Sequence, residues 1–305
     1  MASQSKSANA KTPAFSPETA KLRETDWAVV ATTDFDAEHA YRLAGLESYI
    51  DAGQWAAAAR NSGDATRRRS GAMQVVVVVD TVYATFQLEE IIHELRDFAV
   101  AIELSPWGYL FSYIKVFSDR PECVLPDRSD ITMATHCLRS YARHVADVAR
   151  RRHVQVLGEQ PVDTELPFTG DTRVVAADLL QVPRGRITER GVRDNIRIVL
   201  RHITAVLDDT GGGESANVGS DTTLAELARA QLWQWVHHET GVLDSGHIIT
   251  ATLFETWLTE EVTQLAAQES VPGDDLEQAA RLLDDLTRAD KLAPFLPDEA
   301  YRRDH

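Results

Sequence analysis

The spacing of apolar residues predicts a strand, a helix and a second strand in the middle of the chain. Five consecutive valines at positions 75–79 end on Asp80 and predict a strand buried on both faces, as in a parallel sheet. Residues 86–98 carry apolar side chains at helical spacing opposite charged ones, which predicts an amphipathic helix. Residues 99–104 predict the second strand. In such a βαβ unit, ligands bind where the carboxyl ends of the strands meet the loops, and Asp80 and residues 103–108 lie there.

The rest of the chain divides into a mixed part and a helical part. Before residue 188 we expect further strands over residues 26–32 and 153–157, and helices over residues 37–49, 51–60, 106–118 and 135–151. After it the pattern is helical, over residues 189–207, 222–238, 248–268 and 274–288, with glycine or proline between most segments. The sequence therefore predicts an α/β part of about five or six strands followed by a helical part.

Length and charge narrow the range of functions. At 305 residues the chain is long enough for one barrel-sized unit or two ordinary domains. Its 47 acidic side chains outnumber 31 lysines and arginines, and the formal charge of -16 argues against nucleic acid as a partner. No apolar run approaches the roughly 20 residues of a membrane-spanning helix, so we expect no membrane association. Cys123 and Cys137 are the only cysteines, which favours a reducing compartment without a disulfide framework.

We recognise no targeting signal in the first 20 or the last few residues of the sequence. Residues 1–20 are mostly small, polar and basic without an apolar centre, which predicts a disordered tail rather than a secretory signal. The last residues, ending at His305, are not of the Ser-Lys-Leu type that directs proteins to peroxisomes. We therefore expect a cytoplasmic protein.

Runs of residues in the central stretch and in the later helices match one enzyme family. The central matches are Phe86-Gln87, Glu89-Glu90-Ile91, Leu95-Arg96-Asp97, Trp107, Phe111-Ser112-Tyr113-Ile114-Lys115 and Leu125-Pro126-Asp127-Arg128. The later ones lie within residues 186–197 and 221–235, and include Asp221, Glu226, Arg229 and Leu232-Trp233-Gln234-Trp235. With these residues the chain resembles malate synthase of the bacterial and plant type, over roughly residues 43–300. The central match is long and free of gaps, so chance is a poor explanation.

The resemblance implies an α/β fold, a shortened TIM-type (β/α) barrel followed by a helical C-terminal domain. We expect a disordered tail over residues 1–20, the incomplete barrel over residues 21–187 and the helical domain over residues 188–305. A long section that the family carries after the segment matching residues 157–163 is absent, and the chain begins after an arginine-bearing segment of the family. Such a barrel leaves sheet edges open, which implies a homo-oligomer or a paralogue that covers them.

The resemblance also implies a reaction, the condensation of acetyl-coenzyme A with glyoxylate to give malate in the glyoxylate cycle. Asp221 falls at the position of the catalytic base that removes a methyl proton from acetyl-coenzyme A. Asp80 replaces a strand-terminal glutamate that binds Mg²⁺, and Trp107 lies by the expected substrate pocket. Each also has a structural interpretation: Asp221 as a helix N-cap, Asp80 as a cap or loop hydrogen-bond acceptor, and Trp107 as a core aromatic.

Two positions depart from the family pattern and leave the function open. Gly108 stands in place of the second magnesium-binding aspartate, which predicts weak or lost Mg²⁺ binding. Pro106 stands in place of the neighbouring family arginine, and the upstream family arginine has no counterpart, so we expect the arginine that stabilises the developing oxyanion to be missing. Three functions remain: a malate synthase that uses Asp221 and Asp80, a non-catalytic relative that acts as a binding or regulatory subunit, and a related lyase or thioesterase-like enzyme acting on a coenzyme A ester.

Overall fold

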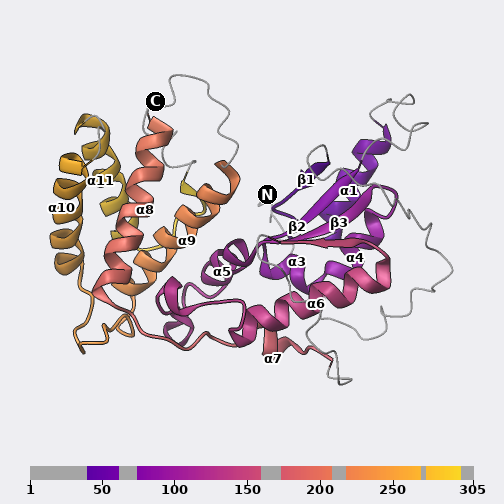
Figure 1. Cartoon of the computed structure of the whole chain (residues 1–305), viewed down its shortest axis with the longest axis horizontal. Helices are drawn as coiled ribbons and strands as arrows, with labels where there is room; N and C mark the ends of the chain where they lie inside the picture. Colours follow the sequence, from indigo (N-terminus) through magenta and orange to yellow (C-terminus); the bar gives the residue numbers. More distant parts are fainter. Residues whose placement is uncertain (1–39, 62–73, 159–172, 208–217, 269–272, 297–305) are drawn as a thin grey trace, which may run out of the picture.

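The computed structural model describes residues 40–61, 74–158, 173–207, 218–268 and 273–296 of the chain. A parallel sheet with its helices lies at one end of the molecule, and a group of long helices lies at the other (Figure 1). The predicted order of an α/β part followed by a helical part is therefore confirmed. In the part of the chain that the structure describes, no helix is both long enough and apolar enough to cross a membrane.

Among the described residues the sheet has four parallel strands in sequence order, as successive strands of a (β/α) barrel have. They are β1 (Tyr41–Leu43), β2 (Val75–Val79), β3 (Ala99–Leu104) and β4 (Gln155–Leu157). Val77 of β2 belongs to the large hydrophobic cluster between the sheet and its helices, whereas Val76 lies in a small cluster with Ala101 on the opposite face. Burial on both faces explains why β2 is an uninterrupted run of valines.

Helices connect and follow the strands, and several of them cover one face of the sheet. They are α1 (Tyr49–Asn61), α3 (Val82–Phe86), α4 (Leu88–Glu94), α5 (Pro106–Val116), α6 (His136–Arg152) and α7 (Ala176–Leu179). Figure 1 shows α3, α4 and α6 below the sheet, and α5 between the sheet and the long helices. Tyr109 of α5 and Tyr141 of α6 stack with their ring centroids 4.7 Å apart, which fixes α5 against α6.

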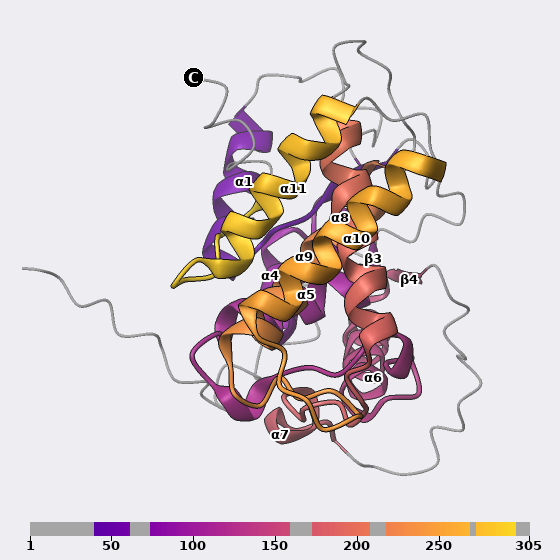
Figure 2. The ribbon, with the colours of Figure 1, turned by 90° about the vertical axis from the view of Figure 1, so that its left-hand side faces the viewer.

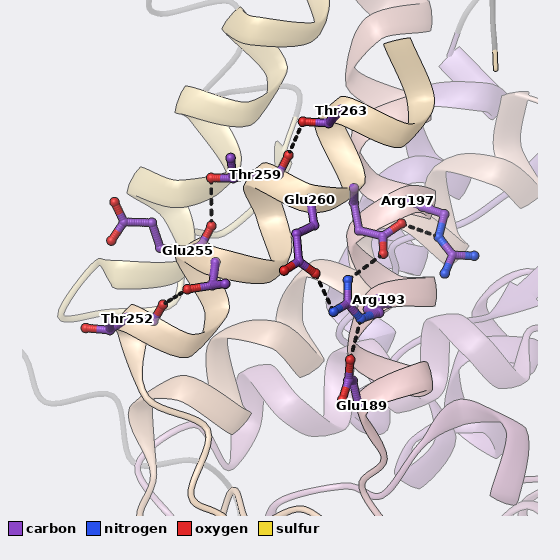
Figure 3. Close-up of polar contacts among 10 residues, drawn as sticks. Glu189, Arg193, Arg197, Thr252, Glu255, Thr259, Glu260 and Thr263 are labelled. Atoms are coloured by element: carbon purple, nitrogen blue, oxygen red, sulfur yellow. Dashed lines mark hydrogen bonds and ion pairs between the residues drawn. The ribbon is translucent and has the colours of Figure 1, made fainter. Parts of the chain in front are cut away.

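The helical part contains α8 (Glu189–Leu207), α9 (Val218–His237), α10 (Ala251–Gln268) and α11 (Gly273–Arg288). These helices share a second hydrophobic cluster. α9 packs against α5, and Figure 2 shows α10 and α11 on the outer side of α8 and α9. Ion pairs join α8 to α10, since Arg193 lies between Glu189 and Glu260 (Figure 3) and also contacts the buried Glu261.

The helix expected over residues 37–49 is wrong. Residues Tyr41–Leu43 form β1, a loop follows, and α1 begins only at Tyr49. Parallel pairing with the first residues of β2 holds this short segment extended. Local sequence does not indicate it, because strand formation depends on the partner strand more than on intrinsic preference.

Other boundaries also differ from the sequence-based expectation. The helix expected over residues 86–98 corresponds to α4 alone, which ends at Glu94, while Phe86 ends α3 and Gln87 is both the C-cap of α3 and the N-cap of α4. Asp221 lies in the first turn of α9 rather than before the helix, so it is not the N-cap of this helix. The strand expected over residues 26–32 and the tail expected over residues 1–20 lie outside the described residues.

Candidate functional site

The carboxyl ends of β2 and β3 place Asp80 beside the start of α5. Asp80 follows the last residue of β2, and α5 begins at Pro106, two residues after β3 ends. The fixed φ of proline suits the first turn of a helix, which explains this start. A Cβ atom built on Gly108 would lie 2.7 Å from the Cβ of Asp80. The two positions that the resemblance assigns to magnesium ligands are therefore neighbours.

The Asp80 carboxylate holds the loop that follows β1. Both of its oxygens lie 3.1 Å from the backbone N–H of Gly45, which donates to them. Gly45 has a φ of 72°, in the left-handed region that glycine adopts without strain. Burial raises the pKa of Asp80 because it disfavours the charged form, while the Gly45 N–H and the positive charge of Lys115 act in the opposite direction.

Tyr141 of α6 joins the ends of β2 and β3. Its hydroxyl donates to the carbonyl oxygen of Val79 at 2.5 Å and accepts the N–H of Ser105 at 3.0 Å. Burial raises the pKa of this hydroxyl, so it remains a neutral donor. No sequence motif singles out Tyr141, because it lies on the apolar face of a helix like many core tyrosines.

The other two candidate residues lie on α5 and α9. Trp107 is half-buried in the first turn of α5 and packs against the hydrophobic cluster of the sheet, which fits the core interpretation. The guanidinium carbon of Arg128 lies 6.0 Å from the Trp107 ring, at the limit of cation–π range. Asp221 is in the first turn of α9, and its side chain lies outside the described part of the structure.

The described residues do not fit a magnesium site built on two carboxylates. Mg²⁺ prefers oxygen ligands in octahedral geometry. Asp80 supplies one carboxylate and Gly108 supplies none, while Glu103 near the end of β3 pairs with Arg42 at 2.8 Å. Across the described ranges, no group of three or more His, Cys, Asp or Glu side chains is arranged to hold a metal ion.

Comparison with protein families identifies the fold. The family model for the malate synthase TIM barrel domain matches residues 43–199, and that for the malate synthase C-terminal region matches residues 186–303. The chain belongs to the malate synthase family. The four parallel strands thus correspond to part of the TIM barrel of malate synthase, and α8 to α11 to its helical C-terminal domain.

Individual relatives are distant and longer. Malate synthase A of Escherichia coli (strain K12) is 28% identical over 321 residues, which cover 86% of this chain and 60% of that protein. Malate synthase of Myxococcus xanthus (strain DK1622) is 28% identical over 291 residues, or 76% of this chain and 53% of that protein. A bifunctional glyoxylate cycle protein of Caenorhabditis elegans is 27% identical over 318 residues, 33% of its length. The chain spans 60% or less of the length of these relatives.

Proposed function

We propose that this member of the malate synthase family is a non-catalytic relative that acts as a binding or regulatory subunit. One observation carries the proposal. Gly108 has no side chain where the resemblance places the second magnesium ligand, and the Cβ of Asp80 lies 2.7 Å from the place where a Cβ at this position would be. Of these two positions Asp80 alone then carries a carboxylate, and it already accepts the Gly45 N–H.

The chemistry of the condensation explains why this loss matters. A base must remove a weakly acidic methyl proton while other groups stabilise the charge that develops on oxygen. By resemblance, Mg²⁺ and an arginine supply that stabilisation, and Pro106 stands in place of the family arginine next to the lost metal ligand. Removing one oxyanion donor from an enzyme lowers its rate by about 10²–10³. A base at Asp221 does not compensate for both losses.

The second candidate is malate synthase activity, the condensation of acetyl-coenzyme A with glyoxylate. It is favoured by the aspartate at position 221, which stands where the family's base is expected and lies within the matched C-terminal region. In this candidate Asp221 removes the proton, Asp80 binds Mg²⁺ and Trp107 lines the substrate site. A lyase or thioesterase-like reaction on another coenzyme A ester is a variant of the same candidate.

The two candidates are separated by binding and turnover measured on the same protein. We expect no saturable heat on titration with Mg²⁺ and glyoxylate, and no thiol release from acetyl-coenzyme A with glyoxylate, from protein that circular dichroism shows to be folded. Turnover that disappears in Asp221→Asn and persists in Asp119→Asn, a matched change at an exposed residue, would contradict the proposal and support the enzyme.

We also propose that a second copy or a paralogue covers the sheet edges, in a cytoplasmic protein. Among the described residues β1 pairs only with β2, and β4 pairs only with β3, so each has one open side. Open edges of parallel sheets are normally covered. Light scattering of the purified chain, alone and with a full-length malate synthase, tests this part of the proposal.

A further inference from the structure

We infer that Asp80 is a structural hydrogen-bond acceptor and that Gly108 is required for packing, so that one substitution cannot rebuild the magnesium site. This inference rests on the proposed non-catalytic function and goes further, because it assigns the two residues a new role. At position 108, where the resemblance places the second magnesium ligand, the structure leaves no free space for a side chain. The space is occupied by the backbone and Cβ of Asp80 itself, 3.3 Å and 2.7 Å from a Cβ at position 108.

The loop after β1 depends on the end of β2 for its hydrogen bonds. The Asp80 carboxylate accepts the Gly45 N–H, and the next residue, Thr81, donates its hydroxyl to the carbonyl oxygen of Leu46 at 2.8 Å. The side-chain oxygen of Gln87 accepts the N–H of Tyr49 at 3.3 Å. Backbone groups of residues 45–49 therefore form hydrogen bonds with side chains of residues 80–87, and the Asp80 carboxylate makes the first of these bonds along the chain.

The start of α5 is held against Asp80 from two sides. The Ser112 hydroxyl accepts the N–H of Val82 at 3.0 Å, and the N–H of Ser105 donates to the Tyr141 hydroxyl at 3.0 Å. A side chain on Gly108 would also meet the Ser105 hydroxyl oxygen at 2.7 Å. An added Cβ thus requires α5 to move away from β2, and that movement stretches both hydrogen bonds.

These contacts predict the behaviour of a Gly108→Asp variant. In a protein with a free second position, the added carboxylate would join Asp80 and raise the affinity for Mg²⁺. In this chain we expect Gly108→Asp to lower the melting temperature and to gain no saturable Mg²⁺ binding. Gly108→Ala should lower it in the same direction, because the collision begins at Cβ.

Thermal unfolding with and without excess Mg²⁺ tests the inference on the full chain. We expect Asp80→Ala to lower the melting temperature by roughly 2–6 °C and Asp80→Asn, which keeps an acceptor for Gly45, to lower it less. Gly273→Ala is the matched control for Gly108→Ala, because nothing lies within 4 Å of a Cβ at that exposed helix start. Mg²⁺ should shift none of these melting temperatures.

Two results would overturn the inference. One is a melting temperature that Mg²⁺ raises in the unmodified chain but not in Asp80→Asn, which makes Asp80 a metal ligand. The other is a Gly108→Ala protein as stable as Gly273→Ala. If Gly108→Ala does not fold, the expected loss of stability is confirmed, and the melting temperatures of Asp80→Ala and Asp80→Asn then test the role of Asp80. Turnover of acetyl-coenzyme A would overturn the proposed function alone, since the order of melting temperatures does not depend on it.

Discussion

At the scale of single residues, several half-buried polar side chains in the sheet part bind backbone atoms. His144 of α6 is an example, since its Nε2 lies 3.0 Å from the carbonyl oxygen of Thr85. Burial lowers the pKa of His144 and the charge of Arg151 adds to this effect, while the Thr85 contact, Glu89 and Asp147 oppose it. The folded chain therefore holds His144 neutral as a donor to Thr85.

The lowered pKa of His144 makes the stability of the chain fall in mild acid. Below about pH 6.5 the unfolded chain takes up a proton at this histidine while the folded chain does not, so the free energy of unfolding decreases as the pH drops. Between pH 7 and about pH 5.5 the free energy of unfolding should fall in both proteins. In His144→Gln, which keeps a donor and does not titrate, we expect this fall to be smaller by up to about 1 kcal/mol than in the unmodified chain.

Urea unfolding at the two pH values measures this difference. His247→Gln is the control, because His247 is exposed and the hydrogen bond described for its ring is with the Ser245 hydroxyl. Equal loss of stability in His144→Gln and the unmodified chain would show that His144 does not contribute. Above pH 7, His144 is neutral in both the folded and the unfolded chain. A further rise in pH should therefore not change the free energy of unfolding through this residue.

At the scale of elements, strong local patterns predicted what the structure contains and weak ones did not. The valine run of β2 and the apolar stretch of β3 gave strands at the predicted residues, because burial on both faces leaves a clear signal. β1 was predicted as helix, since its three residues become a strand only by pairing with β2. The order of the elements and the spacing of apolar residues therefore predicted most of the fold.

For the candidate site, too, one feature was predictable from the sequence and another was not. That Asp80 and residue 108 lie at one edge of the sheet follows from parallel strands, because their carboxyl ends meet there. The 2.7 Å approach of Gly108 to Asp80 was not predictable, because it depends on how α5 is seated by Tyr141 and Ser112. Contacts between segments far apart in the chain decide whether neighbouring positions leave room for a ligand.

The ion pairs between α8 and α10 give a prediction about these elements. Glu261 of α10 is 1% exposed and accepts from Arg193 at 2.9 Å and from Arg197 at 2.6 Å, while Glu260 is 48% exposed (Figure 3). Removing one partner of a buried ion pair leaves an uncompensated charge and costs about 3–5 kcal/mol. An exposed pair is worth about 0–1 kcal/mol.

Arg193 and Arg197 are partly exposed and keep other carboxylate partners, so we expect Glu261→Ala to destabilise the chain by about 1–3 kcal/mol and Glu260→Ala by no more than about 1 kcal/mol. Urea unfolding followed by circular dichroism measures both. The two changes are adjacent in one helix and alter helix propensity equally, so propensity cancels in the comparison. Equal free energies of unfolding for the two variants would mean that the buried carboxylate does not hold α10 to α8.

At the scale of the whole molecule, α9 belongs to both parts. Leu227 lies in the hydrophobic cluster of the sheet, whereas Leu232 lies in that of the long helices. Polar side chains of α9 also reach the segment before α6, since Gln231 donates to the carbonyl oxygen of Pro126 at 2.7 Å and Trp235 to that of Leu125 at 2.8 Å. The predicted division at residue 188 stays a prediction, but these contacts cross it.

This arrangement predicts that the two parts unfold together. Trp235→Phe keeps most of the ring and leaves the buried Leu125 carbonyl oxygen without this donor, so we expect it to cost about 1–3 kcal/mol. Trp257→Phe is the matched control, because no hydrogen bond is described for that indole in the structure. The loss should lower the unfolding midpoint of both parts, since α9 contributes to both clusters.

Two probes in one urea titration test the coupling. Far-ultraviolet circular dichroism follows the helices of both parts together, and labelling of Cys137, which is buried in the cluster of the sheet, follows the sheet part alone. Burial raises the pKa of Cys137 to about 11, so its thiol reacts only after opening, and Cys123→Ser removes the second thiol. We expect one midpoint for both probes, moved equally by Trp235→Phe. Labelling of Cys137 at urea concentrations that leave the helices intact would show that α9 does not couple the parts, and that the sheet opens by itself.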